Sequence, residues 1–89
     1  MSLAFVMKAK SKLNKQFDKQ FGEYVKKKRQ EKNWTQPELA SRMGNNFQNI
    51  SSLERGEITP TLFWFYRLAE AFEMEPEDMM KELGFKLKN

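Results

Sequence analysis

The chain has 89 residues and a net charge of +4, and it contains neither cysteine nor histidine. This length favours one small domain with a modest core. Without cysteine there is no disulfide framework and no thiolate metal site, and without histidine the commonest general base and metal ligand are missing. The composition therefore favours a binding protein over an enzyme. We expect no metal, no cofactor and no small-molecule ligand.

Charge is distributed unevenly along the chain. Residues 1–55 contain 12 Lys or Arg and 5 Asp or Glu, a balance of +7, whereas residues 56–89 contain 4 and 7, a balance of −3. A basic first part suits a polyanionic partner that binds one side of the molecule. A lysine-rich solvated surface would give the same counts.

The sequence has no signal for a membrane or for export. The longest apolar run, Leu62–Tyr66, is far shorter than the roughly 20 residues that span a bilayer. The apolar residues 3–7 are too few for the core of a signal peptide and follow no charged segment. We therefore expect a cytoplasmic protein without a membrane partner.

Residues 1–16 form a predicted basic arm, which is partly disordered or extends the first helix. Its lysines, Lys8, Lys10, Lys12 and Lys15, either follow DNA phosphates when the protein is bound or belong to an idle tail. After the arm, glycines and prolines are expected to divide the chain into short helical segments, and Gly22 is the first of them. We expect one domain over residues 17–85 and a short tail over residues 86–89.

The first predicted helix covers residues 17–32 and can begin as early as residue 12. Its apolar stripe has a spacing of three or four residues and consists of Leu13, Phe17, Phe21, Tyr24 and Val25. Asn33 is a suitable end, because asparagine tolerates the left-handed backbone conformation.

The second predicted helix begins at Thr35 and runs to about Met43. Thr35 can cap the amide of Glu38, and the Glu38 side chain can reach back to Thr35. Pro37 lies in the first turn, where proline costs least. Gly44 then ends the helix in a position that favours positive φ.

The third predicted helix covers about residues 47–55 and has Asn46 as its N-cap. Ile50 and Leu53 are its inward positions. Only about three residues separate it from the second helix, so the two must turn sharply. Ala40 and Ser51 are small enough for the crossing point of the two helices.

Two more helices complete an all-α domain around one core. The fourth begins near Thr59-Pro60-Thr61, with either threonine as its cap, and the fifth begins at Pro76 and ends at Gly84. Met79 and Leu83 are the inward positions of the fifth. The fourth has a longer predicted buried stripe, which consists of Leu62, Phe65, Leu68, Ala69 and Phe72.

Two short helices joined by a tight glycine turn, the second with a polar outer face, form a helix-turn-helix. The sequence resembles the Cro/repressor-type helix-turn-helix family over residues 21–84. The motifs that carry the resemblance are Thr35-Gln36-Pro37-Glu38-Leu39-Ala40, Gly44, Ile50-Ser51, Leu53-Glu54-Arg55-Gly56, Pro60-Thr61-Leu62 and Leu68-Ala69-Glu70-Ala71-Phe72. The resemblance implies a five-helix, lambda-repressor-like domain that is usually dimeric. Its third helix would enter the major groove of a near-palindromic operator, so double-stranded DNA is the expected partner.

By the same resemblance, the exposed face of the third helix carries the residues that read bases: Phe47, Gln48, Asn49 and Ser52. Gln48 or Asn49 could bond adenine at two points, and Phe47 could touch a thymine methyl group. The alternative is that these side chains are merely solvated.

A second group would contact phosphates and so position the protein without specifying a sequence. Gln36 and the region of Arg55 match family positions for backbone contacts, and the helix starts at Gln36 and Asn46 offer amides. Lys32 and Arg42, together with Lys26 and Lys27, supply general charge. Arg29 and Glu54 match a family ion pair that would fix the angle of the reading helix. Two independent surface charges are the alternative.

Three residues depart from the family pattern. Lys28 stands where a core leucine is usual, and its stem could cover the core while its ammonium reaches out to solvent. Asn45 replaces an apolar anchor in the turn, and Phe47 replaces a common polar residue. The operator sequence can therefore not be transferred from a relative.

The fourth helix carries more aromatic side chains than one core can use. Phe63, Trp64 and Tyr66 either pack more tightly, against Phe5 and Val6 of the arm, or form an exposed patch for dimerisation. In the family the dimer contact often lies near the fifth helix, which adds Met74, Met80 and Phe85 as candidates. We expect a homodimeric transcriptional regulator, most simply a repressor. The alternative is an antitoxin-like or coactivator-like protein-interaction module that uses this aromatic face.

Overall fold

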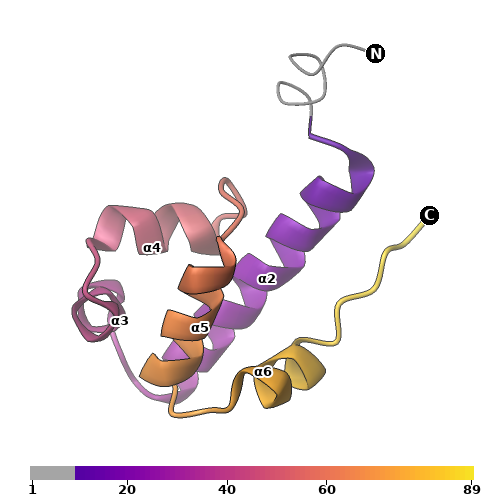
Figure 1. The fold of residues 1–89 in the computed structure, drawn as a ribbon. Helices are drawn as coiled ribbons and strands as arrows, with labels where there is room; N and C mark the ends of the chain where they lie inside the picture. The colour runs from indigo at the N-terminus through magenta and orange to yellow at the C-terminus, as the bar shows by residue number, and fades with distance from the viewer. Residues whose placement is uncertain (1–9) are drawn as a thin grey trace.

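A computed structural model of the chain describes residues 10–89 (Figure 1). Over this range the fold is all-α, as predicted. It consists of five helices: α2 (Lys12–Glu31), α3 (Gln36–Met43), α4 (Phe47–Glu54), α5 (Leu62–Ala71) and α6 (Pro76–Leu83). None of these helices has the length and apolarity that crossing a membrane would need. The predicted contacts of Phe5 and Val6 lie outside the described residues.

Helix α2 begins at the early end of the predicted range. It starts at Lys12 because Ser11 caps it, with the Ser11 Oγ accepting a hydrogen bond from the Asn14 N–H at 3.1 Å. It ends one residue before the predicted position, and Asn33 follows at a φ of +59°. Residues 12–16 are thus helical. The division of the chain at residues 16 and 85 stays a prediction.

The predicted caps of α3, α4 and α5 are present. Thr35 Oγ1 accepts from the Glu38 N–H at 3.2 Å, Asn46 Oδ1 accepts from the Asn49 N–H at 2.9 Å, and Thr61 caps α5. The Glu38 carboxylate bonds the Thr35 hydroxyl instead of its backbone N–H, which alters the predicted reciprocal cap. Gly44 ends α3 at a φ of +68°. Helix α4 ends at Glu54, one residue earlier than predicted.

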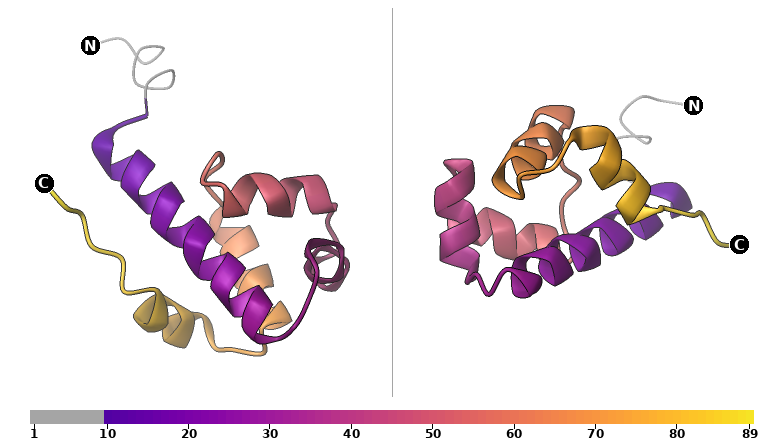
Figure 2. Two further views of the ribbon diagram at one scale, coloured as in Figure 1. Left: turned by 180° about the vertical axis from the view of Figure 1, so that it is seen from behind. Right: turned by 90° about the horizontal axis from the view of Figure 1, so that it is seen from below.

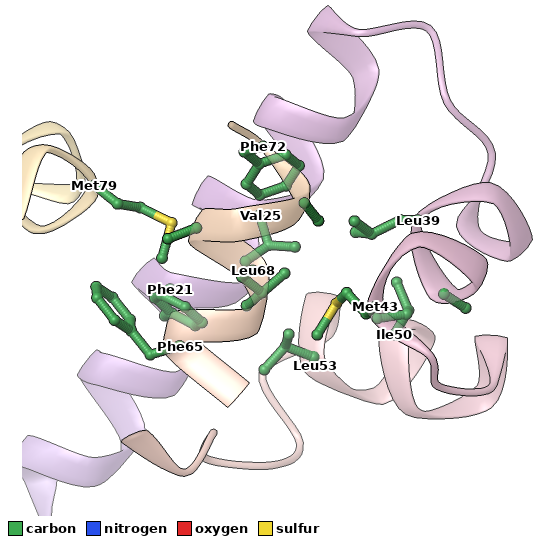
Figure 3. Close-up of a cluster of buried hydrophobic side chains, with 13 residues drawn as sticks. Phe21, Val25, Leu39, Met43, Ile50, Leu53, Phe65, Leu68, Phe72 and Met79 are labelled. Carbon is green, nitrogen blue, oxygen red and sulfur yellow. The ribbon is translucent and has the colours of Figure 1, made fainter. Parts of the chain in front are cut away.

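The core is a single cluster to which all five helices contribute (Figure 3). Phe21 and Val25 of α2 lie at its centre, together with Ile50 and Leu53 of α4. The remaining large members are Leu39, Met43, Phe65, Leu68, Phe72 and Met79.

Two residues of the predicted apolar stripes are exposed. Leu62 is 72% exposed and Leu13 is 52% exposed. Leu62 is the first residue of α5 and Leu13 the second of α2. Both lie one turn before the buried part of their helix, beyond the edge of the core, so the predicted burial of Leu62 is wrong.

Gly22 was expected to separate helical segments because of its residue type. It lies instead inside α2, at the crossing with α4. A Cβ atom there would lie 2.4 Å from the Leu53 carbonyl oxygen and 2.8 Å from the Glu54 carbonyl oxygen. Glycine is therefore required for the close approach of the two backbones. This contact holds α4 close to α2. Figure 2 shows the arrangement of the helices from two further sides.

The chain returns along α2 after α6 (Figure 1). Lys86 and Gln20 exchange two hydrogen bonds between the Lys86 peptide groups and the Gln20 side-chain amide, at 2.9 and 3.3 Å. Lys88 and Gln16 exchange the same pair of bonds. Phe85 packs edge to face on Phe17, with ring centroids 5.4 Å apart. Residues 85–88 are thus fastened to α2.

Candidate DNA-binding surface

Helix α4 is anchored on one side and open on the other. Ile50 and Leu53 are fully buried against α2 and α3, whereas Phe47 is 47% exposed and Gln48 is exposed. Asn49 and Ser52 are half-buried on the flank of the helix. Of the four predicted base readers, Phe47 and Gln48 are therefore the most accessible.

The turn before α4 is held by polar bonds instead of an apolar anchor. Asn45 Oδ1 accepts from the Asn46 N–H and from the Asn49 side-chain amide, both at 2.8 Å. Asn45 thus compensates for the apolar residue that is usual there. The same bond occupies one N–H of Asn49, so contact between this amide and a base has to compete with it.

A buried polar cluster fixes the angle of α4. Arg29 of α2 donates from Nε to Glu54 Oε2 at 2.7 Å and from Nη2 to Glu54 Oε1 at 3.0 Å. The two side chains are only 11% and 3% exposed, so the ion pair expected from the sequence is present and largely shielded from water. Such a two-point bond has one orientation and therefore restricts rotation of α4 against α2.

The start of α3 joins this cluster. Gln36 Nε2 donates to Glu54 Oε1 at 3.1 Å, and Arg29 Nη1 donates to the Trp34 carbonyl oxygen at 2.7 Å. Every buried side-chain nitrogen and oxygen over residues 10–89 has a partner. Gln36, a predicted phosphate contact, thus has an internal role, and its second amide hydrogen remains for a phosphate oxygen.

Two of the predicted phosphate contacts lie over an aromatic ring. The Arg42 guanidinium lies 4.1 Å and the Lys32 ammonium 5.3 Å from the centre of the Trp34 ring. Trp34 itself stacks on Phe72, with centroids 6.0 Å apart. The ring attracts both cations and so places positive charge on the surface around the start of α3.

Arg55, which follows α4, is paired within the chain. Its guanidinium donates to both carboxylate oxygens of Glu57, at 2.8 and 3.1 Å, and also bonds the Ser51 hydroxyl. The hydrogen bonding from Arg55 to Glu57 holds the pKa of the Glu57 carboxyl below its usual value. Phosphate would therefore compete with Glu57 for Arg55.

Sequence reasoning missed Asp18, whose side chain is fully buried. Thr59 Oγ1 donates to Asp18 Oδ1 and Lys10 Nζ to Asp18 Oδ2, both at 2.6 Å. Asp18 thereby ties the loop after α4 to α2. A charged residue at position 18 lies on the same helical face as Gly22 and Val25, and this could have signalled a buried polar contact.

Lys28 covers the core in part, and its ammonium pairs with a carboxylate instead of reaching free solvent. Its Nζ lies 3.0 Å from Glu82 Oε1, and its side chain is 18% exposed. The Tyr24 hydroxyl donates to the same Glu82 oxygen at 2.8 Å. Burial and the bond to Glu82 raise the pKa of Tyr24, so this hydroxyl stays a donor and links α2 to α6.

The six dimer candidates fall into two groups. Phe63, Tyr66 and Met80 are 67%, 55% and 63% exposed, and Leu62, which sequence reasoning placed in the core, joins them. Trp64 and Met74 are half-buried against the core, and Phe85 is half-buried on Phe17. Helices α5 and α6 therefore present an exposed apolar face.

Comparisons with known proteins agree with this geometry. A helix-turn-helix family model matches residues 25–79. An uncharacterized HTH-type transcriptional regulator of Archaeoglobus fulgidus is 38% identical over 55 residues, which are 62% of this chain and 78% of that protein. The uncharacterized HTH-type transcriptional regulator y4dJ of Sinorhizobium fredii is 49% identical over 43 residues, which are 48% of this chain. That match spans only 56% of y4dJ.

A solved structure shares the fold. The crystal structure of the restriction-modification controller protein C.AhdI of Aeromonas hydrophila aligns with a TM-score of 0.62 and 29% identity, over 66% of this chain and 86% of that chain. The similarity in sequence covers the helix-turn-helix of α3 and α4 and its supporting helices. The chain belongs to the Cro/C1-type helix-turn-helix family of DNA-binding transcriptional regulators.

Proposed function

We propose that this protein binds double-stranded DNA as a homodimer and regulates transcription by occupying a near-palindromic operator, without catalysis. Residues 17–85 form the binding domain. The observation that carries the proposal is the arrangement of α4: its inner side is locked by Ile50, Leu53 and the Arg29–Glu54 pair, and its outer side is left to Phe47 and Gln48. A rigid helix with an accessible outer side suits the major groove.

Readout is divided unequally among the four residues. Gln48 is the principal reader, because its exposed amide can bond adenine N6 and N7 at two points. Phe47 contacts a thymine methyl group. Asn49 and Ser52 contribute less, since both are half-buried and the Asn49 amide already bonds Asn45.

Phosphate contacts flank the reading helix. Gln36 and Asn46 offer donors at the starts of α3 and α4, while Arg42 and Lys32 add charge beside Trp34. Arg55 contributes after exchanging Glu57 for a phosphate. If six to ten phosphates are neutralised, affinity should fall by about 10³–10⁵-fold between roughly 50 and 200 mM salt. A salt dependence close to zero would contradict DNA binding by this surface.

The apolar face of α5 and α6 supports the dimer. Phe63, Leu62, Tyr66 and Met80 are exposed there, and such a face is typical of an interface that buries its apolar centre. A dimer that binds two half-sites one turn of DNA apart requires its two α4 helices to lie about 34 Å apart.

A protein-interaction module of the antitoxin or coactivator kind is the second candidate, because the exposed ring of Phe63 could equally bind a different protein. The two functions are separated by substitution. Phe63→Ala should weaken self-association and leave α4 intact, whereas Gln48→Ala should change base preference and leave association intact. If Phe63→Ala removes a partner protein and Gln48→Ala has no effect on DNA, the second candidate is correct.

Selection of bound sequences from random duplex DNA tests the proposal most directly. We expect the intact protein to select a near-palindromic site, and Gln48→Ala to lose preference at one base pair of each half-site, at a cost of about 1–3 kcal/mol. Phe47→Ala should relax preference for a thymine. Asn89→Ala, an exposed amide at the far end of the chain, is the control and should select the same site. Failure of the intact protein to select any sequence would refute operator binding.

A further inference from the structure

A groove of about 750 Å³ lies between α5 and α6. Leu62, Phe65 and Tyr66 of α5 line one side, and Met80 and Leu83 of α6 line the other. The rings of Phe17 and Phe85, which pack against each other, also contribute to its lining. Because exposure of so much apolar surface to water is unfavourable, we expect an apolar occupant.

The chain enters the described structure beside this groove. Lys10 Nζ lies 2.6 Å from Asp18 Oδ2 and 3.3 Å from the Glu57 carbonyl oxygen. Asp18 in turn accepts from Thr59, and Thr59 lines the groove. The Lys10–Asp18 pair is largely shielded on the Asp18 side, whose side chain is 0% exposed. Lys10 is therefore a defined starting point for the residues that precede it.

Those residues include five apolar ones in succession, Leu3-Ala4-Phe5-Val6-Met7. They lie three to seven positions before Lys10, which corresponds to a reach of about 10–25 Å for extended chain. We propose that Leu3–Met7 docks in the α5–α6 groove of its own chain, with the Lys10–Asp18 pair as its anchor.

The same chain is a better source of the occupant than a second copy. A short tether gives the segment a high effective concentration at its own groove. A two-fold dimer brings the same patch of both copies together, so a hollow at the axis would face another hollow and leave a void. A filled groove removes this problem and leaves Phe63, which does not line it, for contact with the second copy.

Paramagnetic broadening in NMR spectra tests this placement. Since the chain contains no cysteine, Ser2→Cys carries a single nitroxide label. We expect selective loss of the amide signals of Leu62, Tyr66 and Met80, while those of α3 persist. Uniform broadening, or none at the groove, would overturn the proposal.

Two further samples assign the occupant. In a mixture of spin-labelled chain without ¹⁵N and unlabelled ¹⁵N chain, groove signals should persist, and their loss would show that the segment comes from a partner copy and overturn the assignment to its own chain. In the labelled protein, Phe5→Ser with Val6→Ser should restore the groove signals, whereas Lys8→Ser should not. Persistent broadening in the double variant would also contradict docking. These readouts need no DNA, so they fail or succeed independently of operator binding.

Discussion

The molecule has two halves, one built from α2, α3 and α4 and the other from α5 and α6. They differ in how far their side chains already have partners within the chain. In the first half, Glu54 receives donors from Arg29 and Gln36, and Asn45 closes the turn. In the second half, Phe63, Tyr66 and Met80 remain exposed beside a groove. The difference indicates that α4 is oriented before DNA binds, whereas the α5–α6 face leaves apolar side chains for the docked segment and a second copy to cover.

The largest expected effect is on the Glu54 cluster. Arg29→Ala leaves the Glu54 carboxylate buried without its main partner, and we expect it to lower the free energy of unfolding by about 3–5 kcal/mol. Urea denaturation followed by circular dichroism measures this. Arg67→Ala is the matched control, since its contact with Glu70 at 3.9 Å is solvent-exposed and worth about 0–1 kcal/mol. Equal losses in the two variants would remove the contrast between the halves.

The next effect concerns the crossing of α2 and α4. Gly22→Ala places a methyl group against the Leu53 and Glu54 carbonyl oxygens, which cannot move without shifting α4. We expect a loss of about 1–3 kcal/mol in stability, with a larger loss in operator affinity because the reading helix tilts. If affinity falls only in proportion to the unfolded fraction, then Gly22 serves stability alone. Thermal unfolding and DNA titration on one sample separate the two.

A smaller effect on folding is expected in the α5–α6 half. Phe63→Ala should change the free energy of unfolding of the monomer by no more than about 0.5 kcal/mol, as is usual for exposed positions. The same change should weaken dimerisation by more than about 1 kcal/mol if Phe63 is central to the interface. Sedimentation equilibrium measures the second quantity, with Leu87→Ala, an exposed apolar residue outside α5 and α6, as control. An unchanged dimer would exclude this face from the interface.

The smallest effect is on Arg55. Glu57→Gln removes the carboxylate that competes with phosphate, so DNA binding should strengthen modestly. The bond from Arg55 lowers the pKa of Glu57 in the folded protein. The pair therefore stabilises the fold fully at pH values above the pKa that Glu57 has in the unfolded chain, and this contribution is lost as the pH falls through the pKa of Glu57 in the folded protein. The gain from Glu57→Gln should therefore shrink on acidification. A gain that is independent of pH would show that charge competition is not its cause.

The sequence predicted those features that depend on local chemistry. Thr35 and Asn46 each cap a helix by bonding the N–H three residues further on, and Gly44 ends α3 through its own left-handed backbone conformation. Because these contacts are local, the helix-turn-helix was predictable. The Arg29–Glu54 pair followed from the family resemblance. Features that depend on two distant segments were missed: Gly22 against the backbone of α4, Asp18 against Thr59, and the groove that leaves Leu62 exposed. Spacing within one helix carries no information on which other helix crosses it.

The fastening of the last residues to α2 has a consequence for how freely they can vary. Gln16 and Gln20 bond the peptide groups of Lys88 and Lys86, and not their side chains. Nearly any residue at 86 and 88 should therefore preserve the attachment, because every non-proline residue offers the same N–H and C=O. Proline alone would delete a donor at either position. Positions 86 and 88 should accordingly tolerate many residue types, whereas few should be able to replace Gln16 and Gln20.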